Sequence, residues 1–202
     1  MSVVSMLTPG ISMNSFEATA HVVTQLEVQR VSYMLVGALS SNAYGIPRAT
    51  KDADIVVSFD SIGVVEFAKS LGVGFKLDRQ MRMETITNSI RNIITYTPTN
   101  FDIELFRLSQ DEHHKERFQR RQRRWLEEIK REAWIPSAED VVIQKLRWKR
   151  RKDLDDAENI LAVRAKKLDW DYLNHWTMIH NTNDLLKQLR DECPNLDVLD
   201  EE

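Results

Sequence analysis

Short apolar runs alternate with amphipathic stretches through the first half of the chain. Near-helical spacing of apolar residues predicts a helix over about 14–30, with Asn14 or Ser15 as its cap. Apolar or β-branched runs bounded by turn residues predict strands at 33–36, 53–58, 75–78, 92–97 and 101–106. The last two would form a hairpin around the turn at 98–100.

Helical patterns connect these strands and then dominate the second half. One helix is predicted over 38–44, and another begins at a cap on Asp60 or Ser61 and ends before Gly72. After Leu108 the strand signals stop, and all five tryptophans follow. Further helices are predicted near 111–131, 137–149, 152–166, 169–180 and 183–191.

These elements predict an α/β (α+β) chain in which a small mixed β-sheet flanked by helices is followed by a helical C-terminal half. The change of pattern divides the chain into a core with an N-terminal helix, residues 1–108, and a helical subdomain, residues 109–202. A length of 202 residues suits one domain with a smaller subdomain.

Composition places the chain among globular proteins of a reducing compartment. With 42% hydrophobic and 29% charged residues, wholesale disorder is excluded. The single cysteine, Cys193, excludes an internal disulfide framework and predicts a cytoplasmic location. Residues 1–13 lack the basic segment and long apolar core of a signal peptide, and no stretch reaches the length of a membrane span.

Charge is unevenly distributed along the chain. Residues 115–152 hold 14 basic and 6 acidic side chains, a local charge of +8, whereas the remainder carries −11. Such asymmetry favours a polyanionic partner, although a basic run can also be a solvated helix face.

Two carboxylates stand at the start of a predicted strand. Asp52 and Asp54 are two residues apart, so their side chains point to the same side. Adjacent carboxylates repel unless a cation offsets them, and oxygen ligands suit Mg²⁺ or Mn²⁺. Asp102 on a later strand is a third candidate, with Glu104 on its face as the alternative. Three carboxylates from adjacent strands can hold two ions for phosphoryl transfer, although Asp-x-Asp is also a common polar strand start.

Residues upstream of the acids suit a phosphate. Gly37 ends a buried strand and opens a short helix, an arrangement that can present backbone N–H groups. Ser40 and Ser41 could add hydroxyl donors, and Arg48 and Thr50 lie just before the acids.

This order of motifs resembles the DNA polymerase β-like nucleotidyltransferase superfamily, whose signature is a glycine motif, an Asp-x-Asp pair and a lone acid on a later strand. The resemblance implies the nucleotidyltransferase fold, a nucleoside triphosphate substrate, and two Mg²⁺ or Mn²⁺ ions held by Asp52, Asp54 and Asp102. It also implies that Asp102 acts as base towards an acceptor hydroxyl. One departure is Gly37-Ala38, where the family usually has Gly-Gly or Gly-Ser.

A bacterial branch of this superfamily, the AbiEii-type and minimal nucleotidyltransferases, gives the more detailed match. The motif Gly45-x-x-Arg48-x-Thr50-x-Asp52-x-Asp54 looks like that branch, as do the Glu-Asp and Lys-Leu pairs within 136–146 and the Arg-x-Asp-x-x-Asp pattern of 151–156. The resemblance covers about 31–161. It implies toxin components of toxin–antitoxin systems, and hence a cognate antitoxin protein as a candidate partner.

Basic side chains of the helical half are candidates for phosphate contacts. Lys145 lies beside the apolar face of its helix and could reach a triphosphate, as the resemblance implies, with Arg151 as a second candidate. Asp153 and Asp156 could hold Arg151 and Lys152 in place by local pairing. The alternative is a solvated cationic face.

Five arginines within 117–124 form the densest basic run. Phosphate-backbone binding needs such density without a particular spacing. The expected nucleic-acid contacts are Arg120, Arg121, Arg123 and Arg124. The alternative is a surface helix with Trp125 turned inward, which we favour for that tryptophan.

The sequence therefore predicts an enzyme that transfers a nucleoside monophosphate to an acceptor hydroxyl. RNA, a protein side chain and a small hydroxylated compound are all candidate acceptors. The resemblance to toxins and the basic run together favour tRNA or another RNA. The alternative is a nucleotidyltransferase fold kept as a non-catalytic nucleotide- or partner-binding module, which the Ala38 departure supports. A third, weaker hypothesis is an RNA-binding protein with incidental acids.

Overall fold

The apolar runs of the first half form a six-stranded mixed sheet in the computed structural model, which describes residues 12–59, 62–84, 86 and 89–193. Its strands are β1 (Ser32–Val36), β2 (Asp52–Ser58), β3 (Phe75–Leu77), β4 (Arg82–Glu84), β5 (Ser89–Tyr96) and β6 (Phe101–Arg107). The order is β1-β2-β6-β5-β3, with β4 also paired to β5. Strands β2 and β6 run parallel, and the other neighbours are antiparallel. The predicted β5–β6 hairpin is confirmed.

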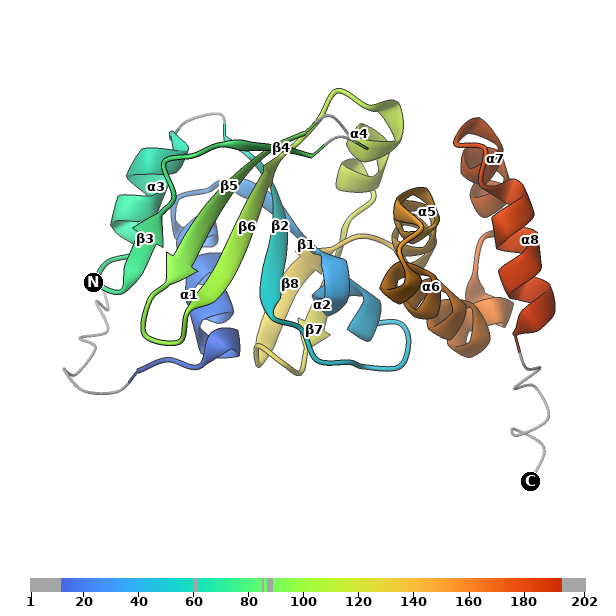
Figure 1. Cartoon of the computed structure of the whole chain (residues 1–202), viewed down its shortest axis with the longest axis horizontal. Coiled ribbons are helices and arrows are strands. Elements are labelled where there is room, and N and C mark those ends of the chain that lie inside the picture. Colours follow the sequence, from blue (N-terminus) through green and yellow to red (C-terminus); the bar gives the residue numbers. More distant parts are fainter. Residues whose placement is uncertain (1–11, 60–61, 85, 87–88, 194–202) are drawn as a thin grey trace.

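Helices cover the sheet and continue beyond it (Figure 1). They are α1 (Ser15–Val28), α2 (Gly37–Asn42), α3 (Val64–Ser70), α4 (Glu112–Gln119), α5 (Ala138–Trp148), α6 (Arg151–Arg164), α7 (Trp170–Ile179) and α8 (Asn183–Glu192), with a 3-10 turn at Ala165–Lys167. Figure 1 shows α5–α8 together, at the opposite end of the molecule from α3. No helix of the described residues is both long and apolar enough to cross a bilayer.

Local sequence signals place several helix ends. The Asn14 side chain accepts hydrogen bonds from the N–H groups of Phe16 and Glu17, and Glu17 accepts from the Asn14 N–H in return, a capping box that starts α1. The Ser137 hydroxyl caps α5 by accepting from the Asp140 N–H. The predicted caps Asp60 and Ser61 lie outside the described residues, and α3 begins after Gly63.

The two faces of the sheet differ in what they carry. Alternate residues of β2 and β6, such as Ile55, Ile103 and Leu105, are fully buried in the main core with residues of α1 and α3. That core continues into α5–α8, and the division of the chain at residue 108 stays a prediction. The opposite face carries the carboxylates and then a smaller apolar cluster containing Val56 and Phe106. The predicted mixed sheet flanked by helices is confirmed.

The helix predicted over 111–131 is wrong in its second half. Helix α4 ends at Gln119, and a two-stranded hairpin follows, formed by β7 (Gln122–Leu126) and β8 (Arg131–Ile135). Long polar side chains concealed the strand alternation, because β7 buries only Leu126. The hairpin is held instead by β8, whose buried Ala133 and Ile135 belong to the main core.

The inward orientation predicted for Trp125, which lies on β7, is also wrong. Its side chain is 55% exposed rather than turned inward, and its indole N–H donates to Glu127 Oε1 at 2.7 Å. A strand directs alternate residues to opposite sides, so burial of Leu126 turns Trp125 outward.

We expect Ile135→Ala to lower the free energy of unfolding by about 2–4 kcal/mol, because it empties a fully buried position of the core. Trp125→Ala in the same hairpin should cost less than about 1 kcal/mol, since most of its surface already faces water. Urea unfolding of both variants measures the difference. Equal losses would contradict the inward and outward assignment of the hairpin residues.

Candidate functional site

Four carboxylates lie on one face of the sheet. Because β2 and β6 are parallel, the register sets Asp52 beside Asp102 and Asp54 beside Glu104. Directly paired residues of neighbouring strands share a face, and residues two apart on a strand share it too. The sequence offered Asp102 and Glu104 as alternatives, whereas the register brings both to the cluster.

Hydrogen bonds and ion pairs distinguish these acids. Glu104 Oε2 lies 2.6 Å from Nη1 of Arg91, so its charge is already balanced. Within the described residues, Asp102 accepts one side-chain hydrogen bond, a neutral one from Thr95 Oγ1 at 2.6 Å. This pairing leaves Asp102, rather than Glu104, as the third carboxylate with charge available to a cation.

Asp54 packs against the first residue of α2. Gly37 has a φ of +64°, and a Cβ built there would lie 2.0 Å from Asp54 Oδ2. No side chain fits at position 37 while Asp54 keeps this place. The glycine that the sequence marked for phosphate contact is therefore also required by the position of the acid.

The ionisation of Asp54 is strongly perturbed. Burial, followed by the charges of Asp52 and Glu104, raises its pKa to about 7, although Lys145 and Lys152 oppose the shift. Among the described residues the Asp54 carboxylate has no hydrogen bond or ion pair. A partly buried acid beside two like charges is what a divalent cation stabilises.

The oxygen ligands of the cluster suit a metal ion, but the side chains would have to move to bind one. Asp52, Asp54 and Asp102 offer hard oxygen ligands from two adjacent strands. Among the described residues, however, no three His, Cys, Asp or Glu side chains already form a group that could hold an ion. The three aspartates would have to reorient to share one.

A cleft lined by charges of both signs includes two of these acids, Asp52 and Asp54, whereas Asp102 and Glu104 do not line it. Gly37, Ala38, Thr50 and Trp148 also line the cleft, and its four cations, here called the basic wall, are Arg48, Lys145, Arg150 and Lys152. The predicted residues Gly37, Arg48, Thr50 and Lys145 are thus brought together with the two aspartates. Thr50 Oγ1 donates to Asp52 Oδ1 at 2.9 Å and fixes that side chain.

Two acids of α6 hold the basic wall in place. Asp156 receives Arg48 Nε at 2.6 Å and Lys145 Nζ at 2.6 Å. Asp153 receives Lys145 Nζ at 3.2 Å and Arg150 Nε at 2.5 Å. The side chains of both aspartates are at most 3% exposed, so their charges act in a medium of low polarity.

The local pairing predicted for Arg151 and Lys152 is therefore wrong. Asp153 and Asp156 form ion pairs with Lys145 and with two arginines that precede α6, because both acids face the protein interior. The Arg151 side chain is 95% exposed, with Asp155 at 3.7 Å, and it does not line the cleft. Arg150 and Lys152 on either side do line it, and sequence reasoning missed Arg150.

The two serines of α2 direct their hydroxyls to their own helix. Ser40 and Ser41 both donate to the Gly37 carbonyl oxygen, at 2.9 and 3.1 Å. Both are buried and neither lines the cleft, although Ser40 borders a neighbouring cavity. Their phosphate contacts stay a prediction.

Arg120 and Arg121 lie away from the cleft and are used internally. The Arg120 guanidinium stacks on the Tyr172 ring at 3.8 Å from its centroid. Arg121 stacks on Phe118 at 4.3 Å and on Trp134 at 5.2 Å. These contacts hold α4 and the hairpin against their neighbours.

Arg123 and Arg124 occupy the hairpin rather than a helix. Arg123 pairs with Glu132 at 3.3 Å and with Glu27 at 3.6 Å. Arg124 donates to Gln122 Oε1 at 3.0 Å. The arginine run is therefore divided over several surfaces, and a nucleic-acid contact for its members stays a prediction.

Comparison with known proteins identifies the fold. No protein-family model matches the sequence, and no curated protein does so either. The antibiotic-resistance factor ANT(2'')-Ia matches with a TM-score of 0.56 at 7% identity, over 89% of this chain and 99% of that one. An antigenic nucleotidyltransferase-like protein from Paracoccidioides brasiliensis matches with a TM-score of 0.51 at 15% identity, over 89% and 94%. At these identities the likeness shows the fold alone, and this chain has the nucleotidyltransferase fold.

We expect Gly37→Ala to lower the free energy of unfolding by about 2–4 kcal/mol, because it adds both a left-handed alanine and a collision with Asp54. Gly72→Ala is the matched control: φ is +82° and nothing lies within 4 Å of the added Cβ, so about 1 kcal/mol is expected. In the Gly37→Ala/Asp54→Ala double variant, part of the lost stability should be recovered. Strict additivity in urea unfolding would contradict the close packing of the two residues.

The metal-free protein should lose stability as the pH rises towards 8. Because the folded-state pKa of Asp54 is about 7 and the unfolded value about 3.8, its contribution is present at pH 4 and lost through pH 7. The free energy of unfolding of Asp54→Asn should therefore exceed that of the parent by about 2 kcal/mol at pH 8. The difference should be smaller at pH 5. Urea unfolding in EDTA at both pH values measures this, with Asp155→Asn, a half-exposed acid, as control.

Proposed function

We propose that this chain is a metal-dependent nucleotidyltransferase, which moves a nucleoside monophosphate from a nucleoside triphosphate to an acceptor hydroxyl. The observation that carries the proposal is the Asp54 carboxylate, which packs on Gly37 beside Asp52 and forms no ion pair with any described residue. Both acids face the basic wall of the same cleft. The fold shared with nucleotidyltransferase-like structures supports this assignment.

Asp52, Asp54 and Asp102 would hold two Mg²⁺ or Mn²⁺ ions. When bound, such ions neutralise charge on the reacting phosphate oxygens and stabilise the attacking and leaving oxygens. Thr50 and Thr95 orient two of these carboxylates by their hydroxyl hydrogen bonds.

The chain's own residues would carry out the rest of the transfer. The acceptor hydroxyl oxygen attacks the α-phosphorus and forms a new P–O bond, while the bond to the oxygen bridging to the β-phosphorus breaks. Pyrophosphate leaves with the bonding electron pair. The hydroxyl proton passes to Asp102. The cleft cations Arg48, Lys145, Arg150 and Lys152 would hold the triphosphate and stabilise the departing charge.

Membership of the AbiEii-type branch, with a toxin role and an antitoxin partner, remains the finer proposal. It rests on the motif from Gly45 to Asp54, whose Arg48, Thr50, Asp52 and Asp54 line the cleft together. RNA as acceptor is less well supported, because the arginines of 120–124 lie outside the cleft.

A non-catalytic nucleotide-binding module is the second candidate. It is favoured by Ala38, which lines the cleft without a hydroxyl, and by Ser40 and Ser41, whose hydroxyls bond the Gly37 carbonyl. Tight nucleotide binding without transfer to any acceptor would support it.

We expect the Asp52→Asn/Asp54→Asn variant to lose at least about 100-fold in transfer rate, because it removes the charge that would bind metal. Labelled triphosphates are incubated with Mg²⁺ or Mn²⁺ and with total RNA, protein or small hydroxylated compounds. Asp155→Asn, a half-exposed acid outside the cleft, is the matched control and should act like the parent. EDTA should abolish transfer. Transfer that survives in the double variant would refute the site.

A further inference from the structure

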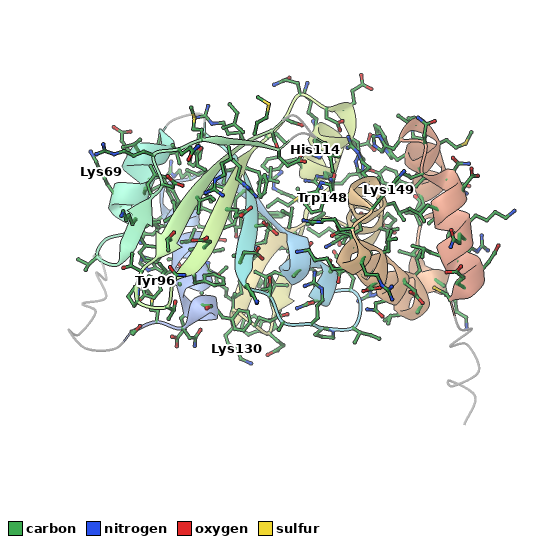
Figure 2. The ribbon with its side chains drawn as sticks, viewed as in Figure 1. Lys69, Tyr96, His114, Lys130, Trp148 and Lys149 are labelled. Atoms are coloured by element: carbon green, nitrogen blue, oxygen red, sulfur yellow. The ribbon has the colours of Figure 1, made fainter. Side chains whose placement is uncertain are left out.

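A second cavity adjoins the carboxylate cleft on the same side of the sheet. Gly37, Lys145 and Trp148 line both, so the two spaces are neighbours. Val56 and Phe106 form part of its apolar lining. These residues lie two positions beyond Asp54 and Glu104 on their strands, which is about 6–7 Å further along the sheet. Figure 2 shows His114 and Trp148, which also line the cavity, between the sheet and α5.

Three buried hydrogen-bond donors in this lining have no partner among the residues that the structure describes. They are Nε of Arg117, Nε2 of Gln144 and Nε1 of Trp148. The orientation of the Gln144 amide is fixed, because its Oε1 accepts from Arg117 Nη1 at 3.2 Å and guanidinium groups only donate. A buried donor without an acceptor is energetically unfavourable, so three in one cavity favour a ligand rich in acceptors.

Arg117 adds a buried positive charge, which Asp140 and Asp111 attract without forming a direct ion pair with it. Its side chain is buried, with 4% of the residue exposed, and in the described part of the chain it forms no ion pair with a carboxylate. Burial lowers the pKa of Arg117 to about 10, so the group stays protonated at neutral pH. His114 adds no second positive charge, because burial and Arg117 lower its pKa to about 2 and keep it neutral. A buried cation of this kind is stabilised most by an anion.

We propose that this cavity binds an oxyanion, a carboxylate or a phosphate monoester, of a small hydroxylated acceptor substrate. The assignment to the acceptor rests on the proposed nucleotidyl transfer. The triphosphate already has the basic wall of the cleft, where Arg48, Arg150 and Lys152 line the same space as Asp52 and Asp54. An anchor about two residues along the strands would let a compound of a few carbons place its hydroxyl near the acids.

The surface chemistry favours a small acceptor over a nucleic acid. Arg117, which forms no direct ion pair with a described residue, is enclosed rather than exposed on the surface. Arg120 and Arg123, which are exposed, already engage Tyr172, Glu27 and Glu132. An apolar lining at Val56 and Phe106 suits the carbon skeleton of a compact molecule.

Anion binding by the metal-free, nucleotide-free protein tests the cavity by itself. Orthophosphate and benzoate are the probes, and calorimetry measures their affinity. We expect Arg117→Met to weaken binding at least tenfold and Trp148→Phe, which removes the indole N–H but keeps an aromatic ring, about threefold. Arg123→Met, outside the cavity, should bind like the parent. Unchanged affinity in Arg117→Met, or a loss confined to Arg150→Met in the neighbouring cleft, would overturn the proposal.

Two further outcomes are distinguished by design. If Arg117→Met does not fold by circular dichroism, Trp148→Phe and Gln144→Leu decide, and parental affinity in both overturns the proposal. Displacement of phosphate by a non-hydrolysable triphosphate would show that the cavity belongs to the nucleotide, and would overturn the assignment to the acceptor.

Transfer assays then identify the source of the oxyanion. Hydroxylated carboxylates, hydroxylated phosphate monoesters, their neutral amide or alcohol counterparts and total RNA are offered with labelled triphosphate and Mn²⁺. Anionic acceptors should be labelled, with KM at least tenfold below their neutral counterparts, and Arg117→Met should raise the acceptor KM while leaving the triphosphate KM unchanged. Labelling of RNA alone would overturn the proposal. Anion binding at Arg117 without any transfer would refute the proposed function and leave the anion site standing.

Discussion

The contact between the Asp54 carboxylate and the backbone of Gly37 constrains the whole site. It requires the end of β1 to lie beside the acidic start of β2. The antiparallel pairing of Val36 with Asp54 meets this requirement. It also requires the chain to turn into α2 at a residue with positive φ, which glycine adopts at little cost. The start of a helix, the end of one strand and the start of another are thereby fixed around one oxygen atom.

The charges around this contact are balanced unequally. On the acidic side Glu104 is neutralised by Arg91, while Asp54 is left with like charges beside it. On the basic side, the acids of α6 balance the cations of the cleft wall, with Asp156 serving both Arg48 and Lys145. The helical half thus holds cations in position at low electrostatic cost. A polyanion entering the cleft would meet side chains that are already ordered.

The sequence predicted those elements whose hydrophobic pattern follows from their own burial. Strands β1, β2, β5 and β6 are apolar runs, and α1 and α5 carry their own caps, Asn14 and Ser137. The β7–β8 hairpin could not be predicted in this way. Its first strand buries only Leu126, and its conformation depends on the packing of Ile135 in a core built by distant segments. Tertiary packing outweighed the helix propensity of arginine and glutamine there.

The residues of the site also differ in whether the local sequence or the tertiary packing determines their role. Asp52 and Asp54 are visible in sequence because spacing alone places them on one side, whereas the choice between Asp102 and Glu104 depends on Arg91, a partner on a neighbouring strand. Unpaired donors such as Arg117 Nε are further from any sequence signal, because a missing partner is a property of packing. A fold that satisfies most of its polar groups and leaves several donors together in one cavity has an incomplete set of contacts there. That deficit is physical evidence about the ligand's chemistry: it specifies acceptor atoms and negative charge.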